Sequence, residues 1–377
     1  MPKGSGMTIR DVARTAGVSS TSISNYLNGR MGEMRPETRE RITSAIKKLG
    51  YTPNSAARQL KTGNAPILGL LVPSVVNPYF GELAVAIDDA AQKRGFRVVL
   101  CNTQRKPERE LEFVRELVAY GVRGILAASV LQNVQVMSKL IQRGVAFVLF
   151  EALGSDPGIE RVDVVSMNNR LATEKAVDHL VSLGHKSMAY VTATPMTPHR
   201  VLRLQGFEES LQRHELGHGL VITDEDIPFR STSHNDADLA KFGHMAALHI
   251  VNMKPGPTAV IAMNDLVALG MMSAFHEQGV NIPESISVVG IDDIQLSSFS
   301  YPALTTIRQP YAQIAETAIE RICARLADPT RTGATISLDP QLITRASTLA
   351  WQPGKKTIGE NQIDEARCRM EDRKGSG

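Results

Sequence analysis

The sequence is poor in cysteine and has no long apolar segment. Its three cysteines, Cys101, Cys323 and Cys368, stand far apart without a C-x-x-C pair, so they predict neither a disulfide framework nor a structural zinc site. No run of about 18 apolar residues occurs, and the first ten residues lack the apolar core of a signal peptide. We therefore expect a globular protein that stays in the cytoplasm and does not contact a membrane.

Motifs of common enzyme classes are also missing. The sequence contains no G-x-S-x-G, P-loop or H-E-x-x-H motif, and the segment PSVVNPYF after the first apolar run lacks the G-x-G-x-x-G of dinucleotide sites. Among nine histidines, only His214 and His218 have i,i+4 spacing, and glycines 217 and 219 disfavour a helical metal face there. An exposed loop is the favoured alternative. These absences predict a protein that is not an enzyme and uses no cofactor or metal.

Charge is distributed unevenly along the chain. Residues 1–63 contain 11 Lys and Arg against 4 Asp and Glu, whereas all 377 residues carry a net charge of only +3. The remaining residues are therefore acidic on balance. A basic segment attached to a mildly acidic body is typical of a protein that meets a polyanion with one end, although a merely solvated basic surface is the alternative. The length favours two or three folding units.

The residues from Thr8 to Ala16 predict a short amphipathic helix. Thr8 and Asp11 have the spacing of a capping box, with Asp in place of the usual Glu. The apolar residues fall on one helical face: Ile9, Val12, Ala13 and Ala16. Gly17 ends the pattern, so the next helix has to follow after a tight turn.

A second helix is predicted after Ser19, which can cap it. Ile23 and Leu27 form its buried edge, and small polar residues face outward: Ser20, Thr21, Ser22 and Asn25. Such residues suit the major groove of DNA, because short side chains allow close approach and an asparagine can pair with an adenine edge. A third helix follows, with Pro36 in its first turn, Gly50 at its end and an inner stripe of Ile42, Ala45, Ile46 and Leu49. This order predicts a helix-turn-helix; a generic three-helix bundle is the alternative.

Two motifs connect this head to a known family. Residues 11–19 read D-V-A-x-x-A-G-V-S, and residues 51–60 read Y-x-P-N-x-x-A-R-x-L. On these motifs the chain resembles the lactose and purine repressor family (LacI/GalR type) over residues 8 to 350 or so. The resemblance implies a hinge helix that folds only on operator DNA. It also implies that two symmetry-related copies of Leu60 wedge into the minor groove and kink the duplex.

The resemblance also implies a double-stranded, palindromic operator bound by a homodimer, because half-site symmetry mirrors protein symmetry. The leucine heptads that form tetramers in the family are missing at the C-terminus, which favours a dimer. At the position of Asn25 many family members carry a basic residue that reads guanine, so the operator sequence is not carried over. The predicted DNA contacts are Thr8, Ile9, Ser19, Ser20, Thr21, Ser22, Asn25, Asn28, Tyr51, Asn54, Ala57 and Leu60.

Beyond Gly63, apolar runs alternate with amphipathic helical stretches. Glycines 95, 121, 144, 184 and 279 stand where a helix has to stop before the next strand. This alternation predicts parallel sheets covered on both faces, in two Rossmann-like lobes with a ligand outside the carboxyl ends of the strands. The eight predicted strands lie at 67–73, 97–103, 124–129, 146–150, 162–167, 187–193, 259–264 and 287–292.

The predicted fold class is an N-terminal all-α helix-turn-helix head plus an α/β, periplasmic-binding-protein-like body of two Rossmann-like lobes. We predict a DNA-binding domain at 7–52, a hinge helix and linker at 53–64, and an effector-binding and dimerisation domain with interleaved lobes at 65–350. The segment 340–348 resembles the closing strand of the family. The polar tail at 351–377 is expected to be disordered.

The resemblance places effector contacts on loops that follow the strands: Ser74, Asn77, Phe80, Asn168, Arg203, Asn264 and Asp292. Such a set suits a sugar or polyol, because a carboxylate accepts from paired hydroxyls and a guanidinium offers a planar fork. Structural alternatives remain, since Asn264 and Asp292 can cap the elements that follow them and Phe80 can belong to the core. Asn168 replaces an aspartate common in the family, and segments 192–200 and 229–240 lack glycines that relatives often have, which leaves the effector identity open.

Together these features predict a sequence-specific transcriptional regulator, with repression favoured over activation. An effector between the lobes would change their angle and thereby the spacing of two heads on DNA. The sequence does not say whether the effector releases or promotes DNA binding. A solute-binding transport protein would share the body but have a signal peptide and no head. A sugar-processing enzyme would need a catalytic constellation, which is not visible.

Overall fold

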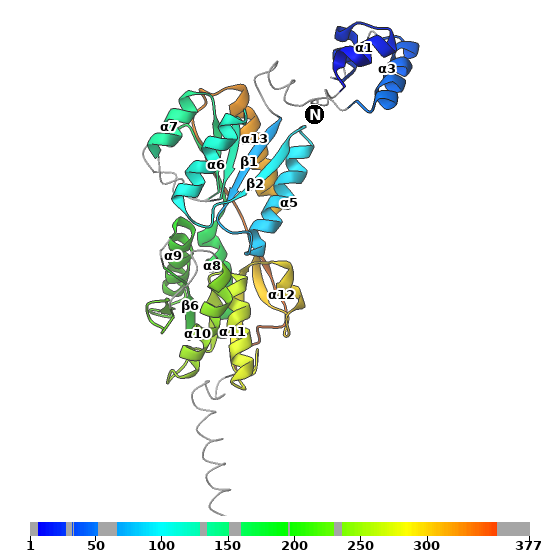
Figure 1. Cartoon of the computed structure of the whole chain (residues 1–377). Coiled ribbons are helices and arrows are strands. Elements are labelled where there is room, and N and C mark those ends of the chain that lie inside the picture. The colour runs from blue at the N-terminus through cyan, green and yellow to red at the C-terminus, as the bar shows by residue number, and fades with distance from the viewer. Residues whose placement is uncertain are drawn as a thin grey trace, which may run out of the picture. The chain divides into compact units, whose positions relative to one another are not determined.

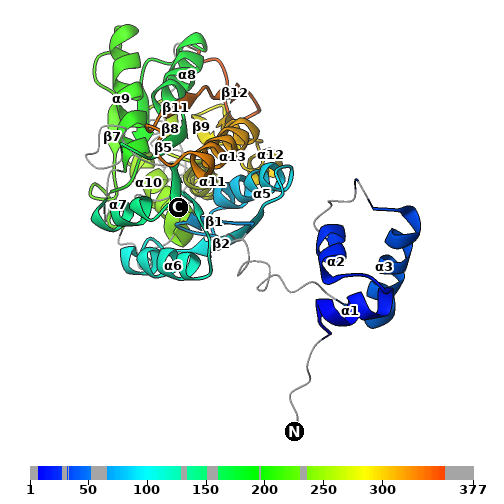
Figure 2. The ribbon, with the colours of Figure 1, turned by 90° about the horizontal axis from the view of Figure 1, so that it is seen from above.

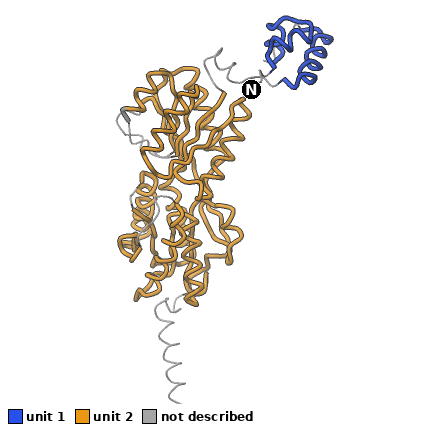
Figure 3. Tube along the Cα trace, in the orientation of Figure 1, with its two compact units in different colours: residues 1–65 blue, residues 66–377 orange. Residues whose placement is uncertain are grey.

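The computed structural model describes residues 7–27, 32, 34–51, 66–128, 134–150, 160–194, 197–229 and 236–352. Its contacts divide the chain into two compact units, residues 1–65 and 66–377 (Figure 3). We call the first unit the head and the second the body. The predicted hinge helix and linker at 53–64, and the tail beyond residue 352, lie outside the described residues.

The head consists of three helices around a small core (Figure 2). Helix α1 spans Ile9–Ala16, α2 spans Ser20–Leu27 and α3 spans Pro36–Leu49. The capping box at the start of α1 forms, and the glycines that end α1 and α3 adopt φ angles of 66° and 57°, in the left-handed region that favours glycine. The buried apolar residues are Val12, Ala13, Ala16, Ile23, Ile42 and Ala45. The predicted helix-turn-helix pattern therefore produces a self-contained core.

The body contains two six-stranded sheets, each the centre of one lobe (Figure 1). The sheet of the N-lobe has the order β11-β5-β4-β3-β1-β2, with all strands parallel. Its strands are β1 Ile67–Val72, β2 Arg97–Asn102, β3 Gly124–Ala127, β4 Ala146–Leu149, β5 Asp163–Met167 and β11 Thr335–Leu338. Parallel strands buried on both faces are what the continuous apolar runs of the sequence predict.

The sheet of the C-lobe repeats this arrangement, with the order β12-β10-β9-β8-β6-β7. Only β12 runs antiparallel to its neighbour, β10. The strands are β6 Met188–Val191, β7 Leu220–Ile222, β8 Ala259–Ala262, β9 Ser287–Asp292, β10 Thr305–Arg308 and β12 Gln341–Ile343. Both lobes therefore have the same strand order, which is typical of doubly wound α/β domains.

Helices cover both sheets. In the N-lobe, α5 Pro78–Gln92 and α13 Tyr311–Ala327 pack together, and α6 Pro107–Ala119 and α7 Val134–Gln142 contribute to a separate apolar cluster with the opposite face of the sheet. In the C-lobe, α8 Asn169–Ser182 packs against α9 Pro198–Arg213, and α10 Leu239–Val251 packs against α11 Asp265–Glu277. The short α12, Gln295–Phe299, follows β9, and a 3-10 turn at Asp236–Asp238 precedes α10.

The chain passes between the lobes three times. It leaves the N-lobe between β5 and α8, returns between β10 and α13, and leaves again between β11 and β12. Each passage takes only a few residues. The lobes are therefore interleaved in sequence, and the carboxyl ends of the parallel strands of both sheets face the cleft between them.

All eight predicted apolar runs contain a strand, and the five glycines predicted to end helices have φ angles between 70° and 83°. The strands that the patterns missed are β7, β10 and β11, and β12 occupies only Gln341–Ile343 of the predicted closing strand. Three of these four strands lie at sheet edges. Edge strands are short and partly exposed, so they lack the continuous apolar run on which the prediction depended.

Candidate DNA-binding face and effector cavity

Helix α2 presents the polar surface of the head. Ser19 precedes it, and its Oγ accepts a hydrogen bond from the Ser22 backbone nitrogen at 3.0 Å. The residues Ser20, Thr21 and Asn25 are exposed, and Ser22 is half-buried. No acidic residue lies in the first turn of α2, so this helix start, where Ser19 already caps the Ser22 amide, does not repel an anion such as a phosphate.

The opposite side of α2 fixes its position. Ile23 is fully buried in the head core, and the Tyr26 hydroxyl forms a 2.7 Å hydrogen bond with Thr43 Oγ1 on α3. These contacts leave the polar residues of α2 as the face directed away from the core. A rigid helix with short polar side chains at its start is the arrangement that reads the major groove.

The other predicted DNA contacts occupy several environments. Thr8 is exposed and caps α1, Ile9 is half-buried and packs against the head core, and Tyr51 does the same at the end of α3. The predicted contacts Asn28, Asn54, Ala57 and Leu60 lie outside the described residues.

A polar cavity lies between the two lobes of the body. The described residues around it enclose about 50 Å³. Residues that follow β1, β2, β4, β5, β8 and β10 contribute to its wall, together with β5, the last residue of β9 and the start of α9. The lining residues are Asn77, Tyr79, Phe80, Arg105, Phe150, Val165, Ser166, Met167, Asn169, His199, Arg200, Arg203, Asp236, Leu239, Met263, Asn264, Asp292, Gln309 and Ile314.

Five of the seven predicted effector residues line this cavity: Asn77, Phe80, Arg203, Asn264 and Asp292. Ser74 and Asn168 are not among the lining residues. Ser74 is buried and its Oγ accepts from the Val76 nitrogen at 3.3 Å, while Asn168 caps α8 through the Leu171 nitrogen at 3.1 Å.

Some of these cavity residues also have the structural roles that the sequence analysis raised as alternatives, namely capping a helix or belonging to the core. Asn264 caps α11 by accepting from the Val267 nitrogen at 3.0 Å, and Asn77 caps α5 by accepting from the Tyr79 nitrogen at 3.1 Å. Phe80 is 3% exposed and belongs to the core. A capping side chain that also lines a cavity is held in one rotamer, so its remaining polar atoms are presented in a defined direction.

Arg203 on α9 is a buried cation of the cavity wall that several contacts hold in place. Its Nε donates to Asn169 Oδ1 at 2.8 Å, and its Nη1 donates to the Met263 carbonyl at 2.5 Å. Its Nη2 lies 3.8 Å from Asp292 Oδ1, and both side chains are less than a tenth exposed. The guanidinium is thus oriented by two neutral acceptors and faces the carboxylate across the cavity wall.

Asp292, the last residue of β9, has an unusual backbone conformation with φ at 126°. Gln309 Nε2 donates to its Oδ1 at 2.7 Å, and the Tyr311 hydroxyl donates to its carbonyl at 3.0 Å. Burial raises the pKa of Asp292 to about 8, against the attraction of Arg203, which lowers it. A carboxyl group held in this way can exchange hydrogen bonds with a ligand hydroxyl.

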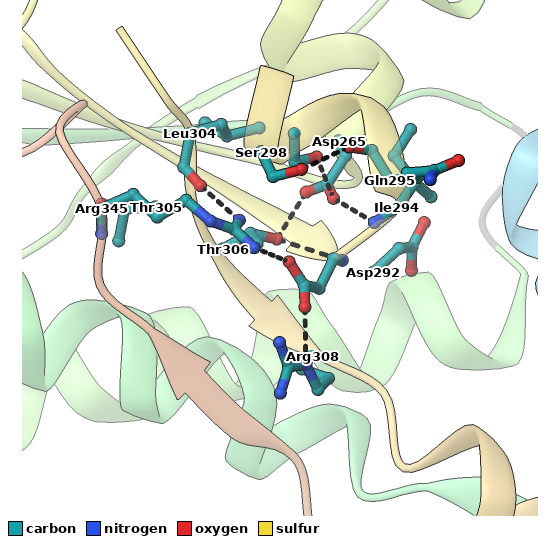
Figure 4. Close-up of polar contacts among 12 residues, drawn as sticks. Asp265, Asp292, Ile294, Gln295, Ser298, Leu304, Thr305, Thr306, Arg308 and Arg345 are labelled. Carbon is teal, nitrogen blue, oxygen red and sulfur yellow. Dashed lines mark hydrogen bonds and ion pairs between the residues drawn. The ribbon is translucent and has the colours of Figure 1, made fainter. Parts of the chain in front are cut away.

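A buried network supports the turn that carries Asp292 (Figure 4). Asp265, at the start of α11, accepts hydrogen bonds from the Ile294 nitrogen at 2.9 Å, Ser297 Oγ at 2.7 Å and Thr306 Oγ1 at 2.5 Å. Burial raises the pKa of Asp265 to about 6, although these three donors lower it. The network ties the turn after β9 to α11, α12 and β10.

The neighbouring Asp293 is held by two arginines. Its Oδ2 accepts from Arg308 Nε at 2.6 Å, and its Oδ1 accepts from Arg345 Nη2 at 2.5 Å (Figure 4). Asp293 also has a positive φ of 56°. Since two consecutive non-glycine residues in this region are strained, the turn persists because the surrounding contacts hold it.

Several cavity residues were missed from the sequence. Among them are Arg105, Asn169, Asp236 and Gln309. Asn169 directly follows the predicted contact Asn168, and Gln309 directly follows β10, a strand that the sequence patterns missed. The sequence around these two residues therefore indicated the site only weakly. Arg105 and Asp236 meet across the cleft, and no local pattern reports a contact between residues 131 positions apart.

The histidine pair considered as a metal site has ordinary contacts. His214 follows the end of α9, and its Nε2 forms a 2.6 Å hydrogen bond with Asp178 on α8, while His218 is exposed. Across the described residues, no group of three or more His, Cys, Asp or Glu side chains is placed to hold a metal ion. In the same part of the chain, no helix is long and apolar enough to cross a membrane.

Comparisons with known protein families match both units. Residues 8–54 match the model described as bacterial regulatory proteins, lacI family, and residues 177–348 match the periplasmic binding protein-like domain. The HTH-type transcriptional repressor PurR of Histophilus somni (strain 129Pt) is 31% identical over 342 residues, which cover 90% of this chain and 98% of the relative. The repressor of the same name from Vibrio atlanticus (strain LGP32) is 28% identical over 340 residues, with coverage of 90% and 98%.

Solved structures give the same result. The lac repressor dimer bound to operator and the anti-inducer ONPF matches with a TM-score of 0.77 and 26% identity, covering 92% of this chain and 100% of that chain. A LacI family transcriptional regulator from Enterococcus faecium with bound ribose matches with a TM-score of 0.64 and 26% identity, covering 76% and 100%. These similarities confirm the predicted helix-turn-helix head and the periplasmic-binding-protein-like body.

Proposed function

This chain belongs to the lacI family of bacterial regulatory proteins, and from that premise we propose that it represses transcription as a homodimer on a palindromic operator. We place this activity in the cytoplasm and propose that a small ligand bound between the lobes regulates DNA binding. The single observation that supports this best is the joint presence, in one chain, of an exposed polar α2 on a basic head and of a polar cavity between two lobes.

The head supplies the DNA contacts. The Asn25 side chain and the hydroxyls of Ser20 and Thr21 are exposed on α2, where they can reach base edges and phosphates in the major groove. The Lys and Arg excess in residues 1–63 supplies the sequence-independent attraction to the phosphate backbone. The neutral Asn25 favours an adenine in the half-site.

The body supplies the dimer contact through an apolar face that we call the α5–β2–α12 face. Helix α5 packs on β2, an edge strand, and Glu82 of α5 accepts a hydrogen bond from the Gln295 nitrogen of α12 at 3.0 Å, so the three elements are neighbours. The exposed apolar residues of this face are Val85, Val99, Leu100, Leu296, Phe299 and Tyr301. An exposed edge strand beside apolar side chains is a surface that a partner commonly covers, and we assign this cover to a second copy, since the similar lac repressor is a dimer.

The cavity supplies the response. Asp292, Arg203 and the amides of Asn77 and Asn264 offer acceptors and donors on opposite walls, which suits a polyhydroxylated ligand such as the ribose of the Enterococcus regulator. A ligand that binds one lobe angle better than another shifts the balance between operator-competent and incompetent dimers by its difference in affinity.

The first experiment is recovery of genomic DNA fragments by the purified protein, repeated with Asn25→Ala and Leu60→Ala. We expect one palindromic motif with the wild type. Asn25→Ala should relax one position of each half-site by about 1–3 kcal/mol of discrimination, whereas Asn281→Ala, an exposed asparagine of the body, should change nothing. If no motif is enriched even at low salt, where phosphate contacts are strongest, the head is not a DNA reader and the proposal fails.

The dimer is tested with two equally exposed aromatic residues. Phe299 on α12 and Tyr120 at the end of α6 are both 75% exposed, so neither is needed for the core. We expect Phe299→Asp to give monomers in sedimentation velocity and to lose most operator affinity, while Tyr120→Asp remains a dimer. A Phe299→Asp protein that stays dimeric would remove the α5–β2–α12 face from the proposal.

A further inference from the structure

One carboxylate of the C-lobe, that of Asp236, is held by two residues of the N-lobe. Asp236 begins the turn before α10, and its side chain is only 3% exposed. Its Oδ2 accepts a hydrogen bond from Asn77 Nδ2 at 2.9 Å. Its Oδ1 accepts from Arg105 Nε at 2.8 Å and lies 2.7 Å from Arg105 Nη2. Both carboxylate oxygens are therefore occupied by partners from across the cleft.

The two partners come from rigid loops of the N-lobe. Asn77 follows β1 and caps α5 with its own Oδ1, so its Nδ2 has a fixed direction. Arg105 follows β2 in a turn where it and Gln104 have φ angles of 54° and 55°. Two consecutive non-glycine residues in the left-handed region carry a conformational cost. The forked, nearly buried contact with Asp236 is the kind of charge-assisted interaction that offsets such a cost.

The contact closes the cavity that the proposed function assigns to the effector. Asp236, Arg105 and Asn77 all line it, and the enclosed volume is about 50 Å³. Ligand pockets for small molecules typically measure about 300–1,000 Å³. A ligand of monosaccharide size therefore enters only when the lobes move apart, and that movement separates Asp236 from Arg105 and Asn77.

We propose that Asp236, Arg105 and Asn77 form a latch that holds the two lobes closed, and that an effector must replace this latch to bind. This inference rests on the proposed function for its account of the ligand but not for its geometry. A ligand that replaces the latch has to offer hydroxyl or ammonium donors to Asp236 and an acceptor oxygen to Arg105 and Asn77. The latch thereby selects for polyhydroxylated ligands and against apolar ones.

The test is amide hydrogen exchange of the full-length protein without any ligand or DNA. In Asp236→Asn, and separately in the more exposed Arg105→Gln, we expect at least tenfold faster exchange in peptides covering 74–80, 103–110 and 236–245. In the double variant the rates should equal those of the faster single variant, because two partners of one contact are not additive. A matched control, Arg170→Gln, breaks an ion pair of 3.2 Å that lies within the C-lobe and should leave these peptides unchanged.

Two outcomes overturn the latch: single variants that exchange like the wild type, or single effects that multiply in the double variant. Two separate variants, Asp236→Asn and Arg105→Gln, are used so that the test survives if one of them misfolds. Unchanged exchange in peptides of β8 and β9 shows that the core of a variant is intact. Operator affinity, measured on the same samples with the recovered genomic motif, separates the two proposals. Absence of DNA binding by the wild type would reject the proposed function while the exchange result still decides the latch.

Discussion

Asp163 of the N-lobe and Asp265 of the C-lobe are the two most deeply buried aspartates that the structure describes, and they are used differently. In the N-lobe, Asp163 at the amino end of β5 accepts from Arg321 and Arg325 of α13 at 2.6–3.0 Å, and from the Ala334 nitrogen at 3.0 Å. In the C-lobe, Asp265 accepts only from neutral donors. The first carboxylate is neutralised by two cations, whereas the second retains its desolvation cost.

The positions of these aspartates explain the difference. Asp163 is the first residue of β5, so it lies at the amino ends of the parallel strands. The cavity lies at the opposite, carboxyl ends. Asp265 accepts a hydrogen bond from the Ile294 nitrogen, in the turn that follows Asp292 (Figure 4). Although the two sheets have the same strand order, the carboxylate that is fully compensated by cations is Asp163, which lies away from the cavity and serves stability. The less compensated carboxylate stands beside the site, where a strained turn has to be held.

The largest expected effect is that of Asp163→Asn. Replacing the carboxylate by a neutral amide leaves the charges of Arg321 and Arg325 without their counter-ion, and Arg325 is only 3% exposed, so we expect a loss of about 3–5 kcal/mol in stability. Thermal unfolding measures it. Asp178→Asn, which breaks an ion pair of half-exposed residues, should cost less than about 1 kcal/mol. Equal losses for the two variants would mean that the buried cluster is not the stabilising contact.

Asp265→Asn should have a smaller effect on stability, about 1–3 kcal/mol, because its partners are neutral donors, and a buried neutral donor costs less to leave unpaired than a buried cation. Its local effect should be greater at the site: faster amide exchange in residues 290–298 and unchanged exchange in residues 162–168. Asp163→Asn should show the reverse pattern. If Asp265→Asn leaves residues 290–298 unchanged, the turn after β9 does not depend on Asp265.

A further expected effect depends on pH. The pKa of Asp292 is raised to about 8 in the folded protein from 3.8, so the folded state keeps a proton that the unfolded chain has lost. The stability contributed by this group therefore falls as pH rises from about 4 to about 8. Asn does not titrate, so the Tm of Asp292→Asn minus that of the wild type should increase between pH 5 and pH 8. A flat difference would mean that Asp292 is charged across this range.

Local patterns predicted the elements that are continuous in sequence. The capping box of Thr8 and Asp11, the glycine stops and the buried central strands each depend on neighbouring residues, and all of them form. The strands β7 and β11 lie at sheet edges, where partial exposure removes the apolar signal. The family resemblance supplied the order of the loops, and the structure brings five of its seven effector residues to one cavity.

The remaining part of the site consists of contacts between residues that lie far apart in the sequence. Asp236 gains its role only because Asn77 and Arg105 approach from the other lobe, 159 and 131 positions away. Asp265 carries no distinguishing mark in the sequence beyond its place after Asn264, since a buried aspartate and an exposed one look alike there. Such contacts arise from tertiary packing, which single-sequence patterns do not report.

The three passages between the lobes also determine the order in which the protein can assemble on the ribosome. The sixth strand of each sheet, β11 or β12, and the helix α13 that covers the N-lobe are made last. Asp163 therefore waits, during synthesis, for Arg321 and Arg325 to be translated more than 150 residues later. Most of the C-lobe, by contrast, is one continuous stretch from α8 to β10. Its turn after β9 nevertheless waits for Arg345, which holds Asp293 and is translated after β12.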